Sequence, residues 1–200
     1  MQHLLIDEIP SPLGRIVIAA RGERLCALEF GRARVIRSLA VRFAGVPLVR
    51  SRDPFGFSRK IRAYLAGDFS AVDDIPVEAR GTALQRRIWR ALRGIPAGST
   101  MSYGAMARAL GLGGAARAVG AANGRNPVSI VIPCHRLIGA DASLTGYGGG
   151  LWRKRWLLCH EGAIGAPPEA VSSKSGSERP RGRDRSPRRT RAARHSGSRR

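Results

Sequence analysis

The spacing of apolar residues changes part-way along this 200-residue chain, and that change sets what the chain can fold into. In residues 4–30, short apolar runs rich in β-branched side chains are separated by turn sequences at 11–14 and 21–23. This pattern predicts a three-stranded antiparallel sheet. Apolar residues then recur every four positions in 35–43 and in 57–65, a spacing typical of helices. We therefore predict an α/β N-terminal domain over residues 1–79.

Helical spacing dominates residues 80–168, which we expect to form a mostly α-helical C-terminal domain. Thr82 and Gln85 make a capping-box pattern at the start of a helix that is apolar at every fourth position. Two short helices follow, over about 102–110 and 115–123, across a glycine-rich turn. The pair predicts a helix-turn-helix, although a generic helical hairpin has the same pattern.

Two further elements are expected before residue 168. Ile130–Ile132 is an apolar, β-branched run closed by Pro133, which predicts a short buried strand. The region from Leu151 to about Gly162 predicts a last helix, with its Leu and Trp side chains in the core and Arg153–Arg155 as its basic face.

Basic residues outnumber acidic ones 35 to 14, for a formal net charge of +21. Residues 1–79 hold 12 basic and 9 acidic residues, 80–170 hold 12 and 3, and 171–200 hold 11 and 2. This excess favours a polyanionic partner, above all nucleic acid; an anionic membrane surface and simple solubility are the alternatives. Residues 169–200 have almost no large apolar side chain, so we expect a disordered Arg/Ser-rich tail.

Composition also excludes several classes of protein. No segment reaches the roughly 18 apolar residues of a membrane helix, and the N-terminus has acids where a signal peptide is basic. We therefore expect a soluble, cytoplasmic protein with no membrane partner. Cys26, Cys134 and Cys159 are odd in number and form no C-x-x-C pair, so we predict neither a disulfide framework nor a metal site.

Pro133–Arg136 places a thiol next to an imidazole, with Cys134 beside His135. Only a thiolate attacks, and an unperturbed cysteine is ionised to a few per cent at pH 7, so a sulfur nucleophile needs a base nearby. Neighbouring residues of a strand point to opposite faces. A sharp turn or a bridging water is therefore needed for the two groups to act together.

The run Asn126–Arg136 resembles the active-site signature of the O6-alkylguanine-DNA alkyltransferases, the methylated-DNA protein-cysteine methyltransferases. More of the family pattern lies at Ser102–Tyr103, Arg117–Gly120, Gly146–Gly150 and Lys154–Gly162. The resemblance covers residues 80–162 continuously, and residues 1–79 fit the family's variable first domain. It implies DNA repair by a direct, single-turnover transfer of the alkyl group from O6-alkylguanine, and also from O4-alkylthymine, to Cys134.

The resemblance implies a role for each residue of the site. Cys134 takes up the alkyl group, and His135 acts on the thiol through a water molecule. Glu161 orients the imidazole and stabilises it when it is protonated. Asn126 braces the site by hydrogen bonds. The phenol of Tyr103 donates to guanine N3 and relieves the negative charge that develops on the leaving base. No cofactor is implied.

A buried thiol cannot reach the O6 of a stacked guanine, so the resemblance also implies that the base is flipped out of the duplex. Arg117 then fills the vacated stack, and its helix approaches the minor groove through small residues. The implied contacts to double-stranded DNA are Arg117, Ala118, Gly120, Ala121, Arg125 and Arg136. The implied contacts to the flipped base are Arg117, Leu137, Tyr147 and Gly148.

Three alternatives stay open. A helix-turn-helix regulator would not need Cys134. A damage-binding relative would recognise alkylguanine without transfer, and the presence of the cysteine counts against it. A cysteine hydrolase built on Cys134, His135 and Glu161 would turn over repeatedly. The favoured hypothesis is a monomeric alkyl acceptor that acts on double-stranded DNA containing O6-alkylguanine.

Overall fold

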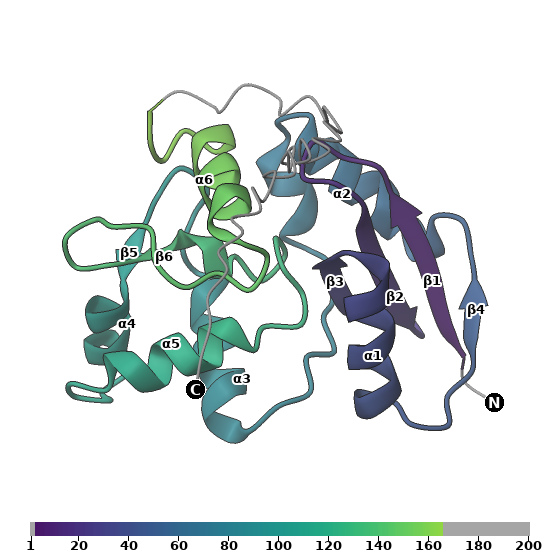
Figure 1. Ribbon diagram of the computed structural model, residues 1–200, viewed down its shortest axis with the longest axis horizontal. Helices are drawn as coiled ribbons and strands as arrows, with labels where there is room; N and C mark the ends of the chain where they lie inside the picture. The colour runs from purple at the N-terminus through teal and green to yellow at the C-terminus, as the bar shows by residue number, and fades with distance from the viewer. Residues whose placement is uncertain (1–2, 166–200) are drawn as a thin grey trace, which may run out of the picture.

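The computed structural model describes residues 3–165, which form a sheet-containing unit followed by a helical unit (Figure 1). The predicted tail, residues 169–200, lies outside the described residues. The elements of the first unit are β1 (Leu4–Ile9), β2 (Ile16–Arg21), β3 (Arg24–Phe30), α1 (Arg32–Arg42), β4 (Leu48–Arg50), η1 (Pro54–Gly56), α2 (Phe57–Leu65) and η2 (Phe69–Val72). Those of the second are α3 (Ala83–Leu92), β5 (Met101–Ser102), α4 (Tyr103–Ala109), α5 (Ala116–Gly124), η3 (Cys134–Arg136), β6 (Leu137–Ile138) and α6 (Leu151–His160).

The predicted antiparallel sheet is confirmed, because β1 pairs with β2 and β2 pairs with β3 in that sense. A fourth strand, β4, joins β1 in parallel and gives the order β3-β2-β1-β4. The sequence did not predict β4, which has three residues, all of them exposed. Such a short edge strand has no periodicity to detect.

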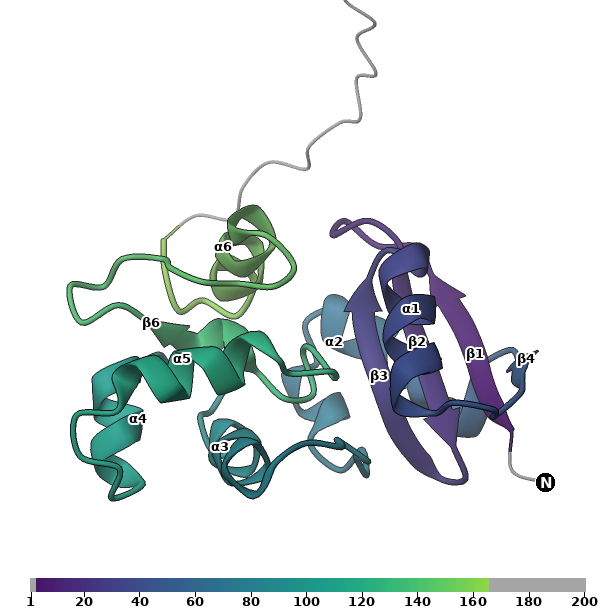
Figure 2. The ribbon, with the colours of Figure 1, turned by 60° about the horizontal axis from the view of Figure 1, so that its bottom comes forward.

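The two faces of the sheet are covered by different elements (Figure 2). On one face, Leu4, Ile6 and Val17 pack against Val35 and Leu39 of α1. On the other face, side chains of the same strands join α2 and the core of the helical unit in one continuous cluster. The alternation of apolar residues along the strands therefore gives the sheet a second apolar face, which packs against the helical unit.

The predicted helices are present, and the local signals at their ends explain why. Thr82 Oγ1 accepts a hydrogen bond from the backbone N–H of Gln85, whose side chain accepts from the N–H of Thr82, so α3 begins with the predicted capping box. Ser102 caps α4 in the same way, by accepting from the N–H of Ala105. In residues 3–165 no helix is long and apolar enough to cross a membrane.

The prediction of a strand at Ile130–Ile132 is wrong. Ile130 has φ 70°, in the left-handed region, and the N–H of Ile132 donates to the carbonyl of Val128, so the chain turns here. All three isoleucine and valine side chains are buried. The apolar run therefore indicates that these residues are buried, but it does not indicate an extended backbone. A short apolar run occurs both in buried strands and in other buried segments.

The prediction of a basic face at Arg153–Arg155 is wrong at its centre. Lys154 is completely buried, and its ammonium donates to the carbonyls of Leu137 and Thr145 at 2.5 and 2.6 Å. The core assignment of the last helix is also only partly right, because Trp152 and Leu151 are about half exposed, at 46% and 48%. A lysine is seldom buried unless its charge is paired, so composition alone favours the solvent-facing prediction.

Candidate active site

A sharp turn presents the predicted nucleophile. Ile130, at a left-handed φ, reverses the chain, and Cys134–Arg136 then form the single helical turn η3. Cys134 and His135 are therefore not successive residues of a strand, in which their side chains would point to opposite faces. Asn126 holds this turn, since its amide donates to the carbonyl of Ile132 at 2.8 Å and its oxygen accepts from the N–H of Val128 at 3.0 Å. The bracing role expected of Asn126 therefore has a structural basis.

The thiol of Cys134 is buried, with 4% of the residue exposed. Burial raises its pKa, while the side chains of Asn126 and Ser129 and the charge of Lys154 act in the opposite direction. The resting sulfur is therefore a neutral thiol, and it becomes a nucleophile only when a base removes its proton.

His135, the residue after Cys134, is paired with a buried carboxylate. Nε2 of His135 is 3.0 Å from Oε1 of Glu161, and both side chains are fully buried. Nδ1 of His135 is also buried and has no hydrogen-bond partner among residues 3–165. Burial lowers the pKa of His135 despite the attraction of Glu161, so the imidazole is neutral near pH 7 and can accept a proton.

Glu161 is held by three donors. Its Oε1 also accepts from Arg136 at 2.7 Å and from the phenol of Tyr64 at 2.6 Å, and its Oε2 accepts from Arg136 at 2.9 Å. Burial opposes ionisation of Glu161, but the hydrogen bonds from His135 and Arg136 outweigh it and hold the pKa of Glu161 well below the usual range. The carboxylate is therefore ionised behind the imidazole at every physiological pH.

The structure places two of the predicted contact residues in the core. Arg136 is 6% exposed, and its guanidinium is hydrogen-bonded to Glu161 and to the carbonyl of Ile95, so its side chain does not face solvent. The side chain of Leu137 is completely buried and is not among the described residues that line the cavity beside Cys134. Both residues follow the reactive Cys-His pair in sequence, but the turn directs their side chains into the core.

A small cavity of about 20 Å³ lies beside Cys134, and the predicted residues Tyr147 and Gly148 line it together with Asn126. The phenol oxygen of Tyr147 is buried without a partner in residues 3–165. Space for about one water molecule is too little for a purine.

The phenol of Tyr103 borders this loop. It donates to the carbonyl of Thr145 at 3.2 Å, with Gly146 O at 3.4 Å, and its ring lies 5.7 Å from the buried ammonium of Lys154. Burial lowers the pKa of Lys154 to about 8, against the pull of Cys134. Tyr103, the first residue of α4, thus lies in the same region as Cys134.

Helix α5 lies beside α4 across a turn containing Gly111 and Gly113, both at positive φ. Its buried side, Val119, Ala122 and Asn123, packs inward, and Asn123 donates to the carbonyl of Cys134 at 3.2 Å. The predicted DNA-contacting residues lie on the remaining surface: Arg117, Ala121 and Arg125 are exposed, and Ala118 and Gly120 are half-buried. Helix α5 thus has one side exposed to solvent, and its buried side contacts the backbone of Cys134.

Sequence reasoning missed several side chains that complete the site. Tyr64 is separated from Glu161 by 97 positions. Arg34, from α1, donates to the carbonyl of Gly148 and pairs with Glu29 at 3.0 Å, so the first unit also holds the loop over the cavity. Only the tertiary fold brings these residues to the site.

In residues 3–165, no group of three or more His, Cys, Asp or Glu side chains could hold a metal ion.

The fold and this site define a class of protein: a four-stranded sheet packed against a helical unit, in which a buried cysteine precedes a histidine paired with a carboxylate, near two helices joined by a glycine-rich turn. Two family models match the chain. Residues 5–79 match the ribonuclease-like domain of 6-O-methylguanine DNA methyltransferase, and residues 83–163 match the DNA binding domain of the same family. The chain belongs to the 6-O-methylguanine DNA methyltransferase family.

Individual proteins that are similar to this chain support the same family assignment. A methylated-DNA--protein-cysteine methyltransferase of Shigella flexneri is 47% identical over 169 residues, covering 82% of this chain and 99% of that protein. A Mycobacterium bovis protein of the same name is 44% identical over 153 residues, with 75% and 87% covered. Among solved structures, Mycobacterium tuberculosis OGT in complex with DNA is 40% identical with a TM-score of 0.68, over 80% of this chain and 93% of that one.

Proposed function

We propose that this protein repairs double-stranded DNA by moving the alkyl group of O6-alkylguanine onto Cys134, once per molecule. The observation that carries the proposal is a buried cysteine followed directly in sequence by a buried histidine whose imidazole is 3.0 Å from a carboxylate. Burial favours the neutral thiol and the neutral imidazole, and Arg136 and His135 keep the carboxylate ionised. Such an arrangement can remove the thiol proton and stabilise the resulting imidazolium.

The reaction then follows in a single displacement. The thiol proton passes through a water molecule to Nδ1 of His135, and Glu161 stabilises the charge. The thiolate attacks the alkyl carbon, a carbon–sulfur bond forms, and the bond to guanine O6 breaks with its electron pair on the base. The protonated His135 returns its proton through solvent to the guanine anion, which leaves a neutral imidazole and a neutral guanine. Tyr103, released from the carbonyl of Thr145, donates a hydrogen bond to N3 of the departing base. The stable thioether ends the reaction, so no cofactor and no second substrate are required.

The helical unit presents the base to this site. We propose that α5 contacts DNA through Arg117, Ala118, Gly120, Ala121 and Arg125, with Arg117 in the place of the flipped base. Movement of the Gly146–Gly150 loop then lets the base in beside Tyr147 and Gly148. We propose further that O4-alkylthymine is also accepted, and that the protein acts as a monomer in the cytoplasm.

A stoichiometric titration tests this function. Duplex DNA with radiolabelled O6-methylguanine is added in excess, and label bound to protein is counted. We expect one methyl group per chain and no further transfer, and none with Cys134→Ser. The matched control, Cys159→Ser, removes another buried thiol and should transfer the full amount. More than one methyl group released per chain would instead indicate the hydrolase alternative.

A further inference from the structure

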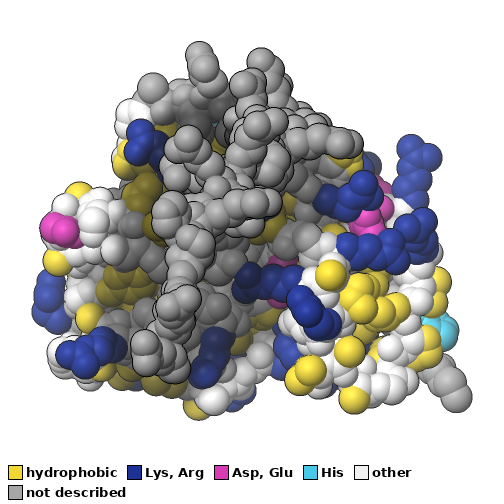
Figure 3. All heavy atoms as spheres, in the orientation of Figure 1, with side chains coloured by type: hydrophobic (Ala, Val, Ile, Leu, Met, Phe, Trp, Pro, Cys, Tyr) yellow, Lys and Arg dark blue, Asp and Glu magenta, His cyan; other side chains and the backbone are white. Residues whose placement is uncertain are grey.

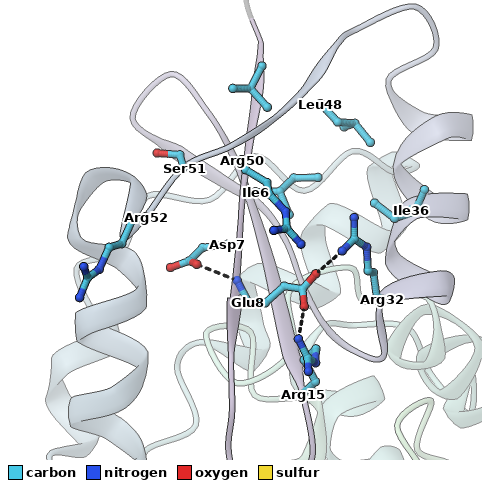
Figure 4. Close-up of a pocket in the computed structure, with 11 residues that line it drawn as sticks. Ile6, Asp7, Glu8, Arg15, Arg32, Ile36, Leu48, Arg50, Ser51 and Arg52 are labelled. Carbon is cyan, nitrogen blue, oxygen red and sulfur yellow. Dashed lines mark hydrogen bonds and ion pairs between the residues drawn. The ribbon is translucent and has the colours of Figure 1, made fainter.

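The sheet-containing unit carries a groove that the proposed reaction does not use. It has a volume of about 460 Å³ and lies between α1 and the edge strand β4 (Figure 4). Apolar and basic side chains line it together, among them Ile6, Ile36, Leu48, Arg15, Arg32 and Arg50. We call it the basic groove. Because β4 lies at the end of the molecule away from α4 and α5 (Figure 1), the groove is separate from the proposed lesion site.

Strand pairing explains why the arginines converge. In the parallel register of β1 and β4, Arg50 lies opposite Ile6, so the two side chains share the face that α1 covers. Glu8 is two residues along β1 and points to that face as well. Arg32 reaches the same place from the first turn of α1, and Arg15 comes from the connection between β1 and β2.

Positive charge exceeds negative charge in the basic groove. Glu8 is its central acid and pairs with Arg15 at 2.6 Å and with Arg32 at 3.0 Å (Figure 4). Arg50 forms no ion pair with any residue between 3 and 165, and nearby Asp7 is engaged by Ser58 and by the backbone of Asp53. A space-filling view shows basic side chains gathered around an acidic one over this unit (Figure 3).

The ion pairs leave most of the donors available. Each arginine uses one terminal nitrogen on Glu8, and the side chains of Arg15 and Arg32 remain 66% and 54% exposed. The carboxylate thus fixes two guanidinium groups next to a third without neutralising them. Convergent guanidinium groups match the oxygens of a phosphate, and a concave surface strengthens their field.

We infer that the basic groove binds a phosphate group of a DNA strand outside the lesion site. The inference rests on the proposed function, because a protein that searches DNA for rare lesions uses contacts that do not depend on sequence. A DNA phosphate and the phosphate of a free nucleotide share the same chemistry. The experiment below separates these two sources.

The test compares Arg50→Ala with the wild-type protein on an undamaged duplex of about 40 base pairs, over a range of salt concentrations. Arg50 has no ion pair to lose, so its removal should leave the fold intact. We expect the slope of log affinity against log salt to become shallower by about one. Between 50 and 200 mM salt, the wild-type protein should then lose roughly three to four times more affinity than the variant.

Arg37→Ala is the matched control, because it removes an exposed arginine of α1 that does not line the groove. It should retain the wild-type slope. An unchanged slope for Arg50→Ala, or an equal change in both variants, would overturn the inference. So would binding of dAMP that Arg50→Ala abolishes without any change in the duplex slope, since the groove would then serve free nucleotides. Alkyl uptake by the wild-type protein, measured in parallel, tests the proposed function separately.

Discussion

At the scale of single residues, Tyr64 connects the two halves of the molecule to the chemistry. Its ring packs against Phe69 and His160, and its phenol donates to Oε1 of Glu161 at 2.6 Å, the oxygen that also faces His135. Each donor to that oxygen lowers the attraction of the carboxylate for a protonated imidazole. We therefore predict that Tyr64 acts as a positioning residue that lowers the basicity of His135 through Glu161.

Tyr64→Phe tests this role. Loss of the phenol strengthens the attraction between Glu161 and protonated His135, so the pKa of His135 rises. Because the neutral imidazole is the base, the acid limb of the alkyl-transfer rate should move to higher pH, by about half a unit to one unit. Stability should fall by about 1–3 kcal/mol. The rate of single-turnover transfer from pH 5 to 8 is the measurement.

Phe69→Leu is the control for Tyr64→Phe, because it disturbs the same aromatic cluster without touching the hydrogen bond. It should lower stability and leave the acid limb where it is in the wild-type protein. If the two variants shift the limb equally, or if neither does, Tyr64 has only a structural role.

Single residues also differ in whether their place in the site could be predicted from the sequence. The Cys-His-Arg run, Asn126 and Glu161 were singled out from the sequence because they are local or belong to a long motif, and their roles stay predictions. Tyr64 and Arg34 were not, since their contacts join segments 97 and 114 positions apart. Lys154 was placed on the surface, and Arg136 was assigned to DNA, because burial of a charged side chain depends on partners that only the fold supplies.

At the scale of elements, the loop Gly146–Gly150 lines the cavity beside Cys134. Tyr147 and Gly148 border this cavity of about 20 Å³, and Arg34 of α1 donates to the carbonyl of Gly148. Gly149 has no room for a side chain, since a Cβ there would lie 2.7 Å from the ring of Tyr147 and 2.8 Å from that of Phe30. The loop is thus tightly packed, and its carbonyls accept hydrogen bonds from Arg34 at Gly148 and from Arg153 at Gly149.

Arg34→Ala should favour the open loop. One partly exposed hydrogen bond to a charged donor contributes on the order of 1 kcal/mol, so reaction of Cys134 with free O6-benzylguanine should become about two to ten times faster. The small substrate is chosen because it needs no DNA contact. Arg37→Ala, on the same helix, should react at the wild-type rate, and a slower or unchanged rate for Arg34→Ala would refute the role of this attachment.

Some helices and strands could be predicted from the sequence, and others could not. Helices α1, α2 and α3 were predicted because their apolar spacing and end signals agree, as in the Thr82–Gln85 capping box. The turn at Ile130–Ile132 was taken for a strand, since a β-branched residue at φ 70° contradicts its local preference and is imposed by surrounding structure. Strand β4 was missed because three exposed residues carry no signal.

At the scale of the whole molecule, basic residues exceed acidic ones by 21, and the excess is large in the residues beyond the described part. Residues 171–200 alone hold 11 basic and 2 acidic residues. We predict that this tail is an additional DNA-binding arm that does not depend on sequence. The expectation that it is disordered stays a prediction.

Removal of residues 171–200 tests this arm. Each phosphate contact contributes about 0.9 to the slope of log affinity against log salt, so loss of the tail should make the slope shallower by several units on undamaged duplex. Methyl transfer at saturating DNA should continue, because the site of Cys134 is complete without the tail. A slope equal to that of the full chain would show that the tail does not contact DNA.

The most direct test of the whole account is the mass of the intact protein after exposure to duplex containing O6-methylguanine under reducing conditions. We predict a single, permanent gain of about 14 Da, one methyl group in place of a proton, mapped by peptide sequencing to Cys134. An unmodified protein, or a methyl group on Cys26 or Cys159 instead, would contradict the assignment of Cys134 as the alkyl acceptor.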